Sequence, residues 1–562
     1  MSASRCVAKL TGADVELGNF VDGAVDHGQS VREASRALLL EIRAQAGVDG
    51  ECAIDDKTEN QQDCGRTFLS TNGGCAYIDL DHLELCIPEV LSAFDHVASW
   101  HAMLRIASSA LASVNDRRPG IERVRLLANN SDGRVSYGSH LNVLVSRTAW
   151  DEIVHRKPHY LAFLAALQVS SLPFTGQGKV GSEHGAAPVA YQLSQRADYF
   201  ETMAGVQTTC MRPLVNTRDE PLCGRWHASR GHQALLHSIF FDSTLCHVST
   251  VLRVGTMQLV LAMIEAGEVD TRCALDDPLV AVRRWSANPT LDARAPLVGG
   301  ERVTALELQR RFLEQATRFV DSGYAEGIVP RASEILALWD ATLTLLEARD
   351  WDALSHRLDW VLKLSFLERA LEYRPELTFA SPEIKHLDHL YSSLDHADGL
   401  FWSMADRGLV ETVVSADDIE RSVILPPGDT RAWGRASLQR RAGAALEEVD
   451  WDFVRVRLHD RHGDADVWRV DLPDPLGSTQ SDVRHVLEGS EARRESLAEL
   501  LQAIGATREP RVVQSHTPAA GAALDWTHAL GPWRHGGTRV ARAAWSTDSQ
   551  AGPQSGGADG TA

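Results

Sequence analysis

The sequence lacks an excess of positive charge, cysteine pair motifs and long apolar segments. Its 56 lysines and arginines stand against 76 aspartates and glutamates, which gives a formal net charge of −20. A nucleic-acid-binding surface needs clustered basic residues, so this balance argues against nucleic acid as a partner. The acidity is typical of a solvated surface, and a preference for basic partners is the alternative interpretation.

The nine cysteines are scattered and include no C-x-x-C pair, so nothing in the sequence resembles a zinc framework. Dispersed thiols are typical of a reducing compartment, where they act mainly as small apolar side chains. Residues 1–10 contain no apolar core of a secretory signal. No apolar run approaches the roughly 18 residues that a membrane helix needs. We therefore expect a cytoplasmic protein that binds neither nucleic acid nor a membrane.

The 562 residues, 44% hydrophobic and 23% charged, are enough for a large catalytic domain and a smaller one. A break at 426–428, Pro-Pro-Gly, separates a domain at 1–425 from a small C-terminal domain at 426–500. The remainder, 501–562, ends in a low-complexity stretch and is expected to be a disordered tail.

Strand and helix patterns are mixed, which predicts an α+β domain whose sheet presents side chains on one face. Strands are expected at 9–20, 75–79, 123–128 and 142–146, helices at 29–46 and 89–114, a polar surface loop at 47–66, and a strongly helical region at 302–370.

Four acidic residues stand out by their positions. Asp14 and Glu16 are two residues apart on a predicted strand and therefore point to the same face. Asp79 ends another strand, and Glu84 follows five residues later. Gathered carboxylates repel one another unless a cation lies between them, and magnesium prefers such oxygen ligands. A solvated strand face is the alternative interpretation of the i, i+2 pair.

For three other polar segments, we compare a structural interpretation with a functional one. The stretch 129–142 is rich in amides and hydroxyls between apolar strands; a hairpin turn explains 131–133 but not Tyr137, His140 and Asn142. Arg218 precedes two acids, so a surface ion pair and a phosphate contact are both open. The stretch 176–179, Gly-Gln-Gly-Lys, lacks the spacing of a phosphate loop and is interpreted as a flexible turn.

In combination and in order, these segments resemble the Dop/PafA family, which comprises the Pup deamidase/depupylase and the Pup ligase. The similar segments are Gly12–Gly18, Thr71–Glu89, Asn129–Asn142, Gln192–Asp198, Asn216–Pro221, Val254–Thr256, Asp359–Lys363, Thr430–Arg435 and Asp450–Trp451. The likeness covers residues 9–475. It implies a glutamine-synthetase-like antiparallel sheet packed with helices, plus a small C-terminal domain.

The resemblance also implies an activity and a site. Family members use ATP and Mg²⁺ to make or break an amide or isopeptide bond at a glutamate γ-carboxyl of Pup, and they belong with the proteasome system. By position, Asp79 would be the catalytic base or nucleophile. The metal ligands would be Asp14, Glu16, Tyr77 and Glu84, and the nucleotide contacts Trp451, Arg196, Arg218, His237 and Arg431. The segments at 71–73, 192–200 and 206–209 are closer to Dop, whereas the short 47–66 insertion is not, so hydrolysis is slightly favoured.

Some positions depart from the family pattern. Cys75 stands where the family has an arginine that contacts ATP, so restoring arginine there is expected to tighten ATP binding. Leu141 replaces an acid expected near Asp79, Ile87 replaces a hydroxyl residue, and Ala234-Leu235 replace two arginines. These losses keep two alternatives open: a carboxylate–amine ligase acting on a small molecule or carrier peptide, and a non-catalytic protein that binds a Pup tail.

Overall fold

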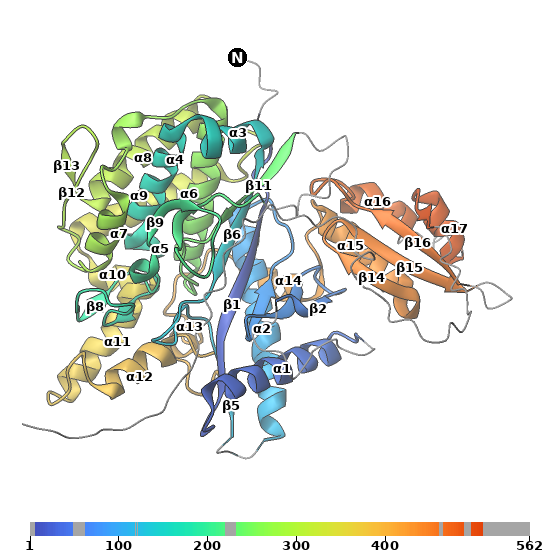
Figure 1. The fold of residues 1–562 in the computed structure, drawn as a ribbon, viewed down its shortest axis with the longest axis horizontal. Helices are drawn as coiled ribbons and strands as arrows, with labels where there is room; N and C mark the ends of the chain where they lie inside the picture. Colours follow the sequence, from blue (N-terminus) through green and yellow to red (C-terminus); the bar gives the residue numbers. More distant parts are fainter. Residues whose placement is uncertain are drawn as a thin grey trace, which may run out of the picture. The chain divides into compact units, whose positions relative to one another are not determined.

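The computed structural model describes residues 6–48, 62–118, 120, 122–219, 232–459, 465–487 and 496–509. At its centre is a seven-stranded antiparallel sheet in the order β11-β6-β1-β4-β3-β2, with β5 also paired to β1 (Figure 1). The strands are β1 (Thr11–Val21), β2 (Cys64–Phe68), β3 (Cys75–Asp79), β4 (His82–Cys86), β5 (Val124–Leu127), β6 (Ser139–Ser146) and β11 (Gln233–Ser238). This sheet, packed with helices, confirms the predicted α+β class.

One face of the sheet is apolar and packs on two helices, α1 (His27–Gln45) and α2 (Ala93–Asp116). Val15 and Leu17 of β1 and Leu85 of β4 are fully buried in this core. Because side chains alternate along a strand, the residues between them face the other side of the sheet. The sequence therefore builds one packing face and one polar face from the same strands.

The helices lie mainly between β6 and the C-terminal strands in the sequence. They include α4 (Pro158–Ser170), α6 (His247–Ala266), α8 (Ala305–Asp321), α9 (Ala332–Ala348), α10 (Trp351–Ser355), α11 (Asp359–Tyr373) and α12 (Pro382–Tyr391). The predicted helical region at 302–370 is confirmed. A capping box between Thr304 and Glu307 begins α8 by satisfying free backbone N–H groups of its first turn.

Helix α6 is long and apolar enough, by length and composition, to pass as a membrane span. Its apolar window is completely buried inside the fold, as in the core helix of a packed domain. The sequence did not indicate this helix as a candidate, because Arg253 and Gln258 interrupt its apolar residues. The cytoplasmic location stays a prediction.

A second, four-stranded antiparallel sheet follows the break at 426–428. It consists of β14 (Leu446–Asp450), β15 (Phe453–His459), β16 (Ala465–Asp471) and β17 (Thr507–Arg508), with helices α15 (Arg431–Ala442), α16 (Gln480–Leu487) and α17 (Leu497–Ala503). Val454, Leu500 and Leu501 are fully buried in a core of its own. The predicted domain limits stay predictions, although β17 lies beyond residue 500. The predicted tail from 510 onward lies outside the described residues.

The buried carboxylate of Glu89 joins α15 to the segment that follows β4. It accepts hydrogen bonds from Arg431 Nε at 2.8 Å and from Arg435 Nη2 at 2.7 Å. Burial alone would raise the pKa of Glu89, but the charges of Arg435 and then Arg431 hold it at about 2. Arg435 also donates to the carbonyl oxygen of Gly73 at 2.8 Å, so α15 is held against the lead-in to β3.

The observed elements differ from the predicted ones mainly at their ends. The helix predicted from residue 89 begins at Ala93, because Ser92 accepts the N–H of Asp95 and caps it. The strand predicted at 142–146 begins at Ser139, where pairing with β1 starts. Of the polar loop predicted at 47–66, residues 49–61 lie outside the described residues, and Cys64–Arg66 belong to β2 rather than to a loop.

Candidate active site

Strand register gathers three carboxylates on the polar face of the sheet. Glu16 of β1 is paired with Glu84 of β4, and Glu84 is paired in turn with Tyr77 of β3. Asp79 is two residues beyond Tyr77 and therefore faces the same side. Ligand oxygens of Glu16, Asp79 and Glu84 all lie within 4.8 Å of one another. The structure thus brings together three of the predicted metal and catalytic residues.

A tight turn places Asp79 at the edge of this cluster. Leu80 and Asp81 form the two-residue connection to His82, with φ angles of 46° and 75°. Positive φ at both central residues is the geometry of a type I′ hairpin, which matches the strand twist. Asp79 therefore ends β3 in a fixed position, opposite His82 on β4.

The charges of neighbouring carboxylates raise the pKa of both Glu84 and Asp79 in this cluster. Burial, then the charges of Asp14 and Glu16, raise the pKa of Glu84 well above its ordinary value. Burial, then the charge of Glu16, raise the pKa of Asp79 to about 7. In the described part of the chain no lysine or arginine forms an ion pair with Glu16, Asp79 or Glu84. An all-oxygen set that lacks a cation fits a hard divalent ion such as Mg²⁺.

A second group adjoins the first and contains two histidines. Ligand atoms of Asp14, His140 and His237 lie within 4.8 Å of one another. Asp14 Oδ2 lies 2.7 Å from His140 Nδ1, and its Oδ1 accepts from Asn142 Nδ2 at 2.5 Å. Burial opposes ionisation of Asp14, but the charge of His140 keeps its pKa below the ordinary value. Asp14 therefore lies between the two groups: it contacts His140, and its charge acts on Glu84.

His140 is the residue that the sequence interpretation left without a role. It shares a strand face with Asn142, which is hydrogen-bonded to His237 Nδ1 at 2.6 Å. Burial and the nearby His140 lower the pKa of His237 to about 3, so this ring is neutral at physiological pH. The i, i+2 spacing of His140 and Asn142 was the signal in the sequence that could have assigned them together.

Tyr77 belongs to a small apolar group against which Trp451 packs. Cys75 is fully buried there with Phe68, Tyr77 and Cys86, and Trp451 packs against this group. The rings of Phe68 and Trp451 are 5.1 Å apart in an edge-on arrangement. The structure thus places the predicted nucleotide-stacking tryptophan next to a predicted metal ligand.

The three predicted nucleotide-contacting arginines lie in different surroundings. Arg196 is buried and donates through Nη1 to the carbonyl oxygen of Tyr137. Arg218 is exposed, and its charge contributes to the low pKa of His237, which places it near the second group. Arg431 is buried in the ion pair with Glu89. A contact between Arg431 and the nucleotide stays a prediction.

Two expectations about substituted positions are wrong. Leu141 was expected beside Asp79, but it is fully buried in the apolar core, since it alternates with His140 and Asn142 on β6. Ile87 was expected at a nucleotide contact, but it is buried in the apolar core under the sheet. Neither residue leaves a polar gap in the carboxylate cluster.

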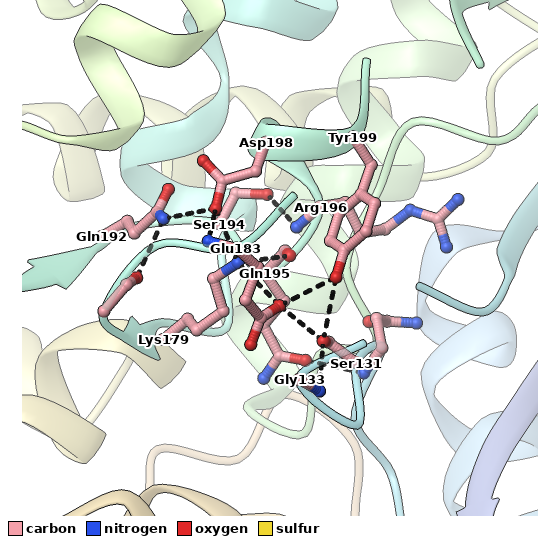
Figure 2. Close-up of polar contacts among 12 residues, drawn as sticks. Ser131, Gly133, Lys179, Glu183, Gln192, Ser194, Gln195, Arg196, Asp198 and Tyr199 are labelled. Carbon is pink, nitrogen blue, oxygen red and sulfur yellow. Dashed lines mark hydrogen bonds and ion pairs between the residues drawn. The ribbon is translucent and has the colours of Figure 1, made fainter. Parts of the chain in front are cut away.

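Lys179 was interpreted as part of a flexible turn, and this is also wrong. Its ammonium group is buried and lies 2.9 Å from Asp198 Oδ2 and 3.0 Å from Glu183 Oε2 (Figure 2). Glu183 Oε2 also accepts from the hydroxyls of Ser131 and, at 3.1 Å, Tyr199. This network fixes the turn at 131–133, which leads into the segment that contains His140 (Figure 2).

Comparisons with known proteins agree with this geometry. The family model described as Pup-ligase protein matches residues 10–455. The Pup deamidase/depupylase of Mycolicibacterium smegmatis is 36% identical over 435 residues, which cover 77% of this chain and 83% of that protein. The depupylase of Acidothermus cellulolyticus is 34% identical, covering 80% and 86%. The Pup–protein ligase of Acidimicrobium ferrooxidans is 33% identical, covering 74% and 88%.

Solved structures give the same result for the fold. The Pup ligase PafA in complex with Pup superimposes with a TM-score of 0.71 at 22% identity, covering 93% of this chain and all of that one. PafA in complex with ADP gives 0.64 at 25% identity, covering 76% and 90%. Shared sequence over most of the length and a shared fold lead to one conclusion: the chain belongs to the Pup ligase family, which includes the depupylases.

Proposed function

We propose that this protein uses ATP and Mg²⁺ to make or break an amide or isopeptide bond at a glutamate γ-carboxyl of Pup or a Pup-like protein. The observation that carries the proposal is the cluster of Glu16, Asp79 and Glu84, whose oxygens converge without an ion-paired lysine or arginine in the part of the chain that the structure describes. A bound divalent ion would neutralise the cluster and the phosphate oxygens of ATP together. Family membership supplies the substrate class.

In this proposal the ligands divide between the two groups. Glu16 and Glu84, with the Tyr77 hydroxyl beside Glu84, would hold one ion on the sheet. Asp14, which lies beside His140 and His237, would contribute its carboxylate to a second ion, because Mg²⁺ prefers oxygen ligands. Asn142 orients this second set through its bonds to Asp14 and His237.

The nucleotide would lie between the sheet and the C-terminal strands. Trp451 would pack on the base, as it lies beside Tyr77 and Cys75 on the polar face. Arg196, Arg218 and His237 would contact the phosphates or the acyl group, and Arg431 would act by holding α15 in place. The relative whose solved complex contains ADP supports nucleotide use by this chain.

Asp79 would be the group that reacts. In ligation its carboxylate would take the proton of the attacking amine, and in hydrolysis it would attack the acyl carbon or activate water. A cation bound in the cluster would offset the charge of Glu16, lower the pKa of Asp79 from about 7, and keep its carboxylate ionised, as either role requires. Hydrolysis is favoured, because the relatives named depupylase are 34% and 36% identical, against 33% for the ligase.

Mass spectrometry of reaction products tests this proposal. The protein is incubated with ATP and magnesium, and with Pup ending in glutamate, Pup ending in glutamine, or a Pup conjugate, each supplied separately. Conversion of glutamine to glutamate, or release of Pup, supports hydrolysis; a mass increase on an added protein supports ligation. ATP binding in calorimetry with all Pup substrates unchanged would instead favour a small-molecule ligase. Absence of ATP binding would leave only a Pup-binding protein.

A further inference from the structure

Two buried arginines near the carboxylate cluster have no carboxylate partner among the described residues. Arg196 is 1% exposed and Arg212 is 7% exposed. Arg196 Nη1 donates to the carbonyl oxygen of Tyr137, and Arg212 Nη2 donates to that of Ser136 at 2.9 Å. Charged side chains are rarely buried unless they are paired. The positive charge of this pair is therefore available to an anion.

The same backbone segment holds these arginines next to Glu16. Gly138, which follows Ser136 and Tyr137, accepts the backbone N–H of Glu16 at 3.1 Å. A Cβ at Gly138 would lie only 2.8 Å from Glu16 Oε1, so the Glu16 side chain passes close over this residue. Three consecutive residues thus place two guanidinium groups beside one member of the carboxylate cluster.

The electrostatic effects agree with this proximity. Burial, then repulsion by Arg212, lower the pKa of Arg196 to about 9, while Asp242 and Glu16 oppose the shift. Burial also lowers the pKa of Arg212, and Glu16 is the first charge that opposes it. Two like charges repel each other here and both sense Glu16, as expected if they lie together at the border of the acidic cluster.

Lys179 is a neighbouring buried cation whose charge is neutralised by carboxylates of the protein. Lys179 is paired with Glu183 and Asp198, whereas the side chain of Arg196 extends away from that network (Figure 2). The Nε of Arg196 is buried and has no hydrogen-bond partner in the described part of the chain. An unused donor on a buried guanidinium is costly unless a ligand accepts from it.

We propose that Arg196 and Arg212 together bind the γ-phosphoryl group of ATP, the group that is transferred in the ligation direction, which adds Arg212 to the site and rests on the proposed function. A glutamate carboxylate oxygen forms a bond to the γ-phosphorus, the bond from that phosphorus to the bridging oxygen breaks, and ADP leaves with the electron pair. The non-bridging oxygens stay on phosphorus, and the planar guanidinium groups donate to them. In ligation the amine then attacks the acyl carbon, its proton passes to Asp79, and phosphate leaves with the electron pair of its bond to that carbon.

Calorimetry with two nucleotides tests the assignment. Wild type, Arg212→Gln and Arg212→Lys are titrated with ADP and with β,γ-imido-ATP, both in millimolar magnesium. In Arg212→Gln, affinity for the imido analogue is expected to fall roughly tenfold to hundredfold, the value of a charge-assisted hydrogen bond, while ADP affinity is unchanged. Arg212→Lys keeps the charge but not the planar guanidinium group. Its affinity for the imido analogue is therefore expected to lie between those of the wild type and Arg212→Gln.

Arg283 provides the matched control, because its Nη2 also donates to a backbone carbonyl, that of Phe200 at 2.7 Å. Arg283→Gln is expected to leave both affinities unchanged. Equal losses for the two nucleotides in Arg212→Gln, or no loss for the analogue, would overturn the inference. If that variant does not fold, an unchanged ratio of the two affinities in Arg212→Lys overturns it as well. Failure of the wild type to bind either nucleotide overturns the proposed function itself.

Discussion

Glu16 and Glu84 are directly opposed across β1 and β4, and both are buried. Like charges in this position destabilise a sheet. No lysine or arginine in the described part of the chain is paired with either of them. The central sheet therefore contains a repulsion that a divalent cation would convert into an attraction, and this couples stability to metal binding.

The first prediction concerns this coupling. Glu84→Gln removes one of the two opposed charges, so the metal-free protein should melt about 2 °C higher or more. The same change should reduce the rise in Tm that millimolar MgCl₂ is expected to produce in the wild type, because one of the two proposed ions loses a ligand. Thermal unfolding with and without MgCl₂ measures both effects. Exposed Glu326→Gln is the control, and a magnesium shift in Glu84→Gln as large as that of the wild type would exclude this residue as a ligand.

The second prediction concerns Asp79. Asp79→Asn keeps the shape of the side chain but can neither accept a proton nor attack as a carboxylate. Turnover of Pup substrates should therefore fall by about 10³-fold or more, while ATP affinity stays near the wild-type value. Asp81→Asn, in the adjoining turn beside Arg32, is the control for local disturbance. Substantial activity in Asp79→Asn would show that another group reacts.

The third prediction reverses an expectation from sequence. Cys75 is fully buried against Phe68 and Tyr77, and the charges of Arg66 and Arg435 already act on it. Adding methylenes to a packed core costs about 1–3 kcal/mol, and arginine at position 75 would cost more because its side chain is much larger than that of cysteine. It would also place a third positive charge at this site. Cys75→Arg should lower Tm by several degrees without tightening ATP binding; Cys75→Ala, measured in parallel, should be close to wild type.

The fourth prediction concerns pH. The pKa of Glu89, about 2, is below its ordinary value of 4.5, so its ionised form stabilises the folded state. This contribution, roughly 3 kcal/mol, is complete above pH 4.5 and is lost as pH falls toward 2. Glu89→Gln should therefore be less stable than wild type at neutral pH, and the difference should narrow between about pH 5 and pH 3. Urea unfolding followed by tryptophan fluorescence measures it; a difference independent of pH would contradict the ion-pair account.

The strands and their faces could be predicted from sequence because alternation is local. The pattern from Ala13 to Leu17 assigns Asp14 and Glu16 to one face with no knowledge of the partner strands. Their division into two groups could not be predicted, because it depends on the strand order β6-β1-β4. Asp14 is opposite His140 of β6, whereas Glu16 is opposite Glu84 of β4.

The ion-pair partners of buried cations could not be predicted from the sequence either. Arg431 was expected at the nucleotide, and the sequence did not indicate its ion-pair partner Glu89, which is 342 residues away in the chain. Lys179 lies in a glycine-containing stretch that is typical of a mobile turn, yet Asp198 and Glu183 bury and fix it. In both cases a carboxylate distant in the sequence determines the environment of the buried cation, and the local composition does not indicate that carboxylate.

The alternation of side chains along β1 also limits which sequence changes the protein can tolerate during evolution. Even-numbered positions such as Asp14 and Glu16 hold the proposed metal ligands, and odd-numbered positions such as Val15 and Leu17 pack in the hydrophobic core. Point substitutions at the even positions can alter metal or substrate preference while the hydrophobic core stays intact. Loss or gain of a single residue would exchange the two sets, send the acids into the core, and remove fold and activity in one step.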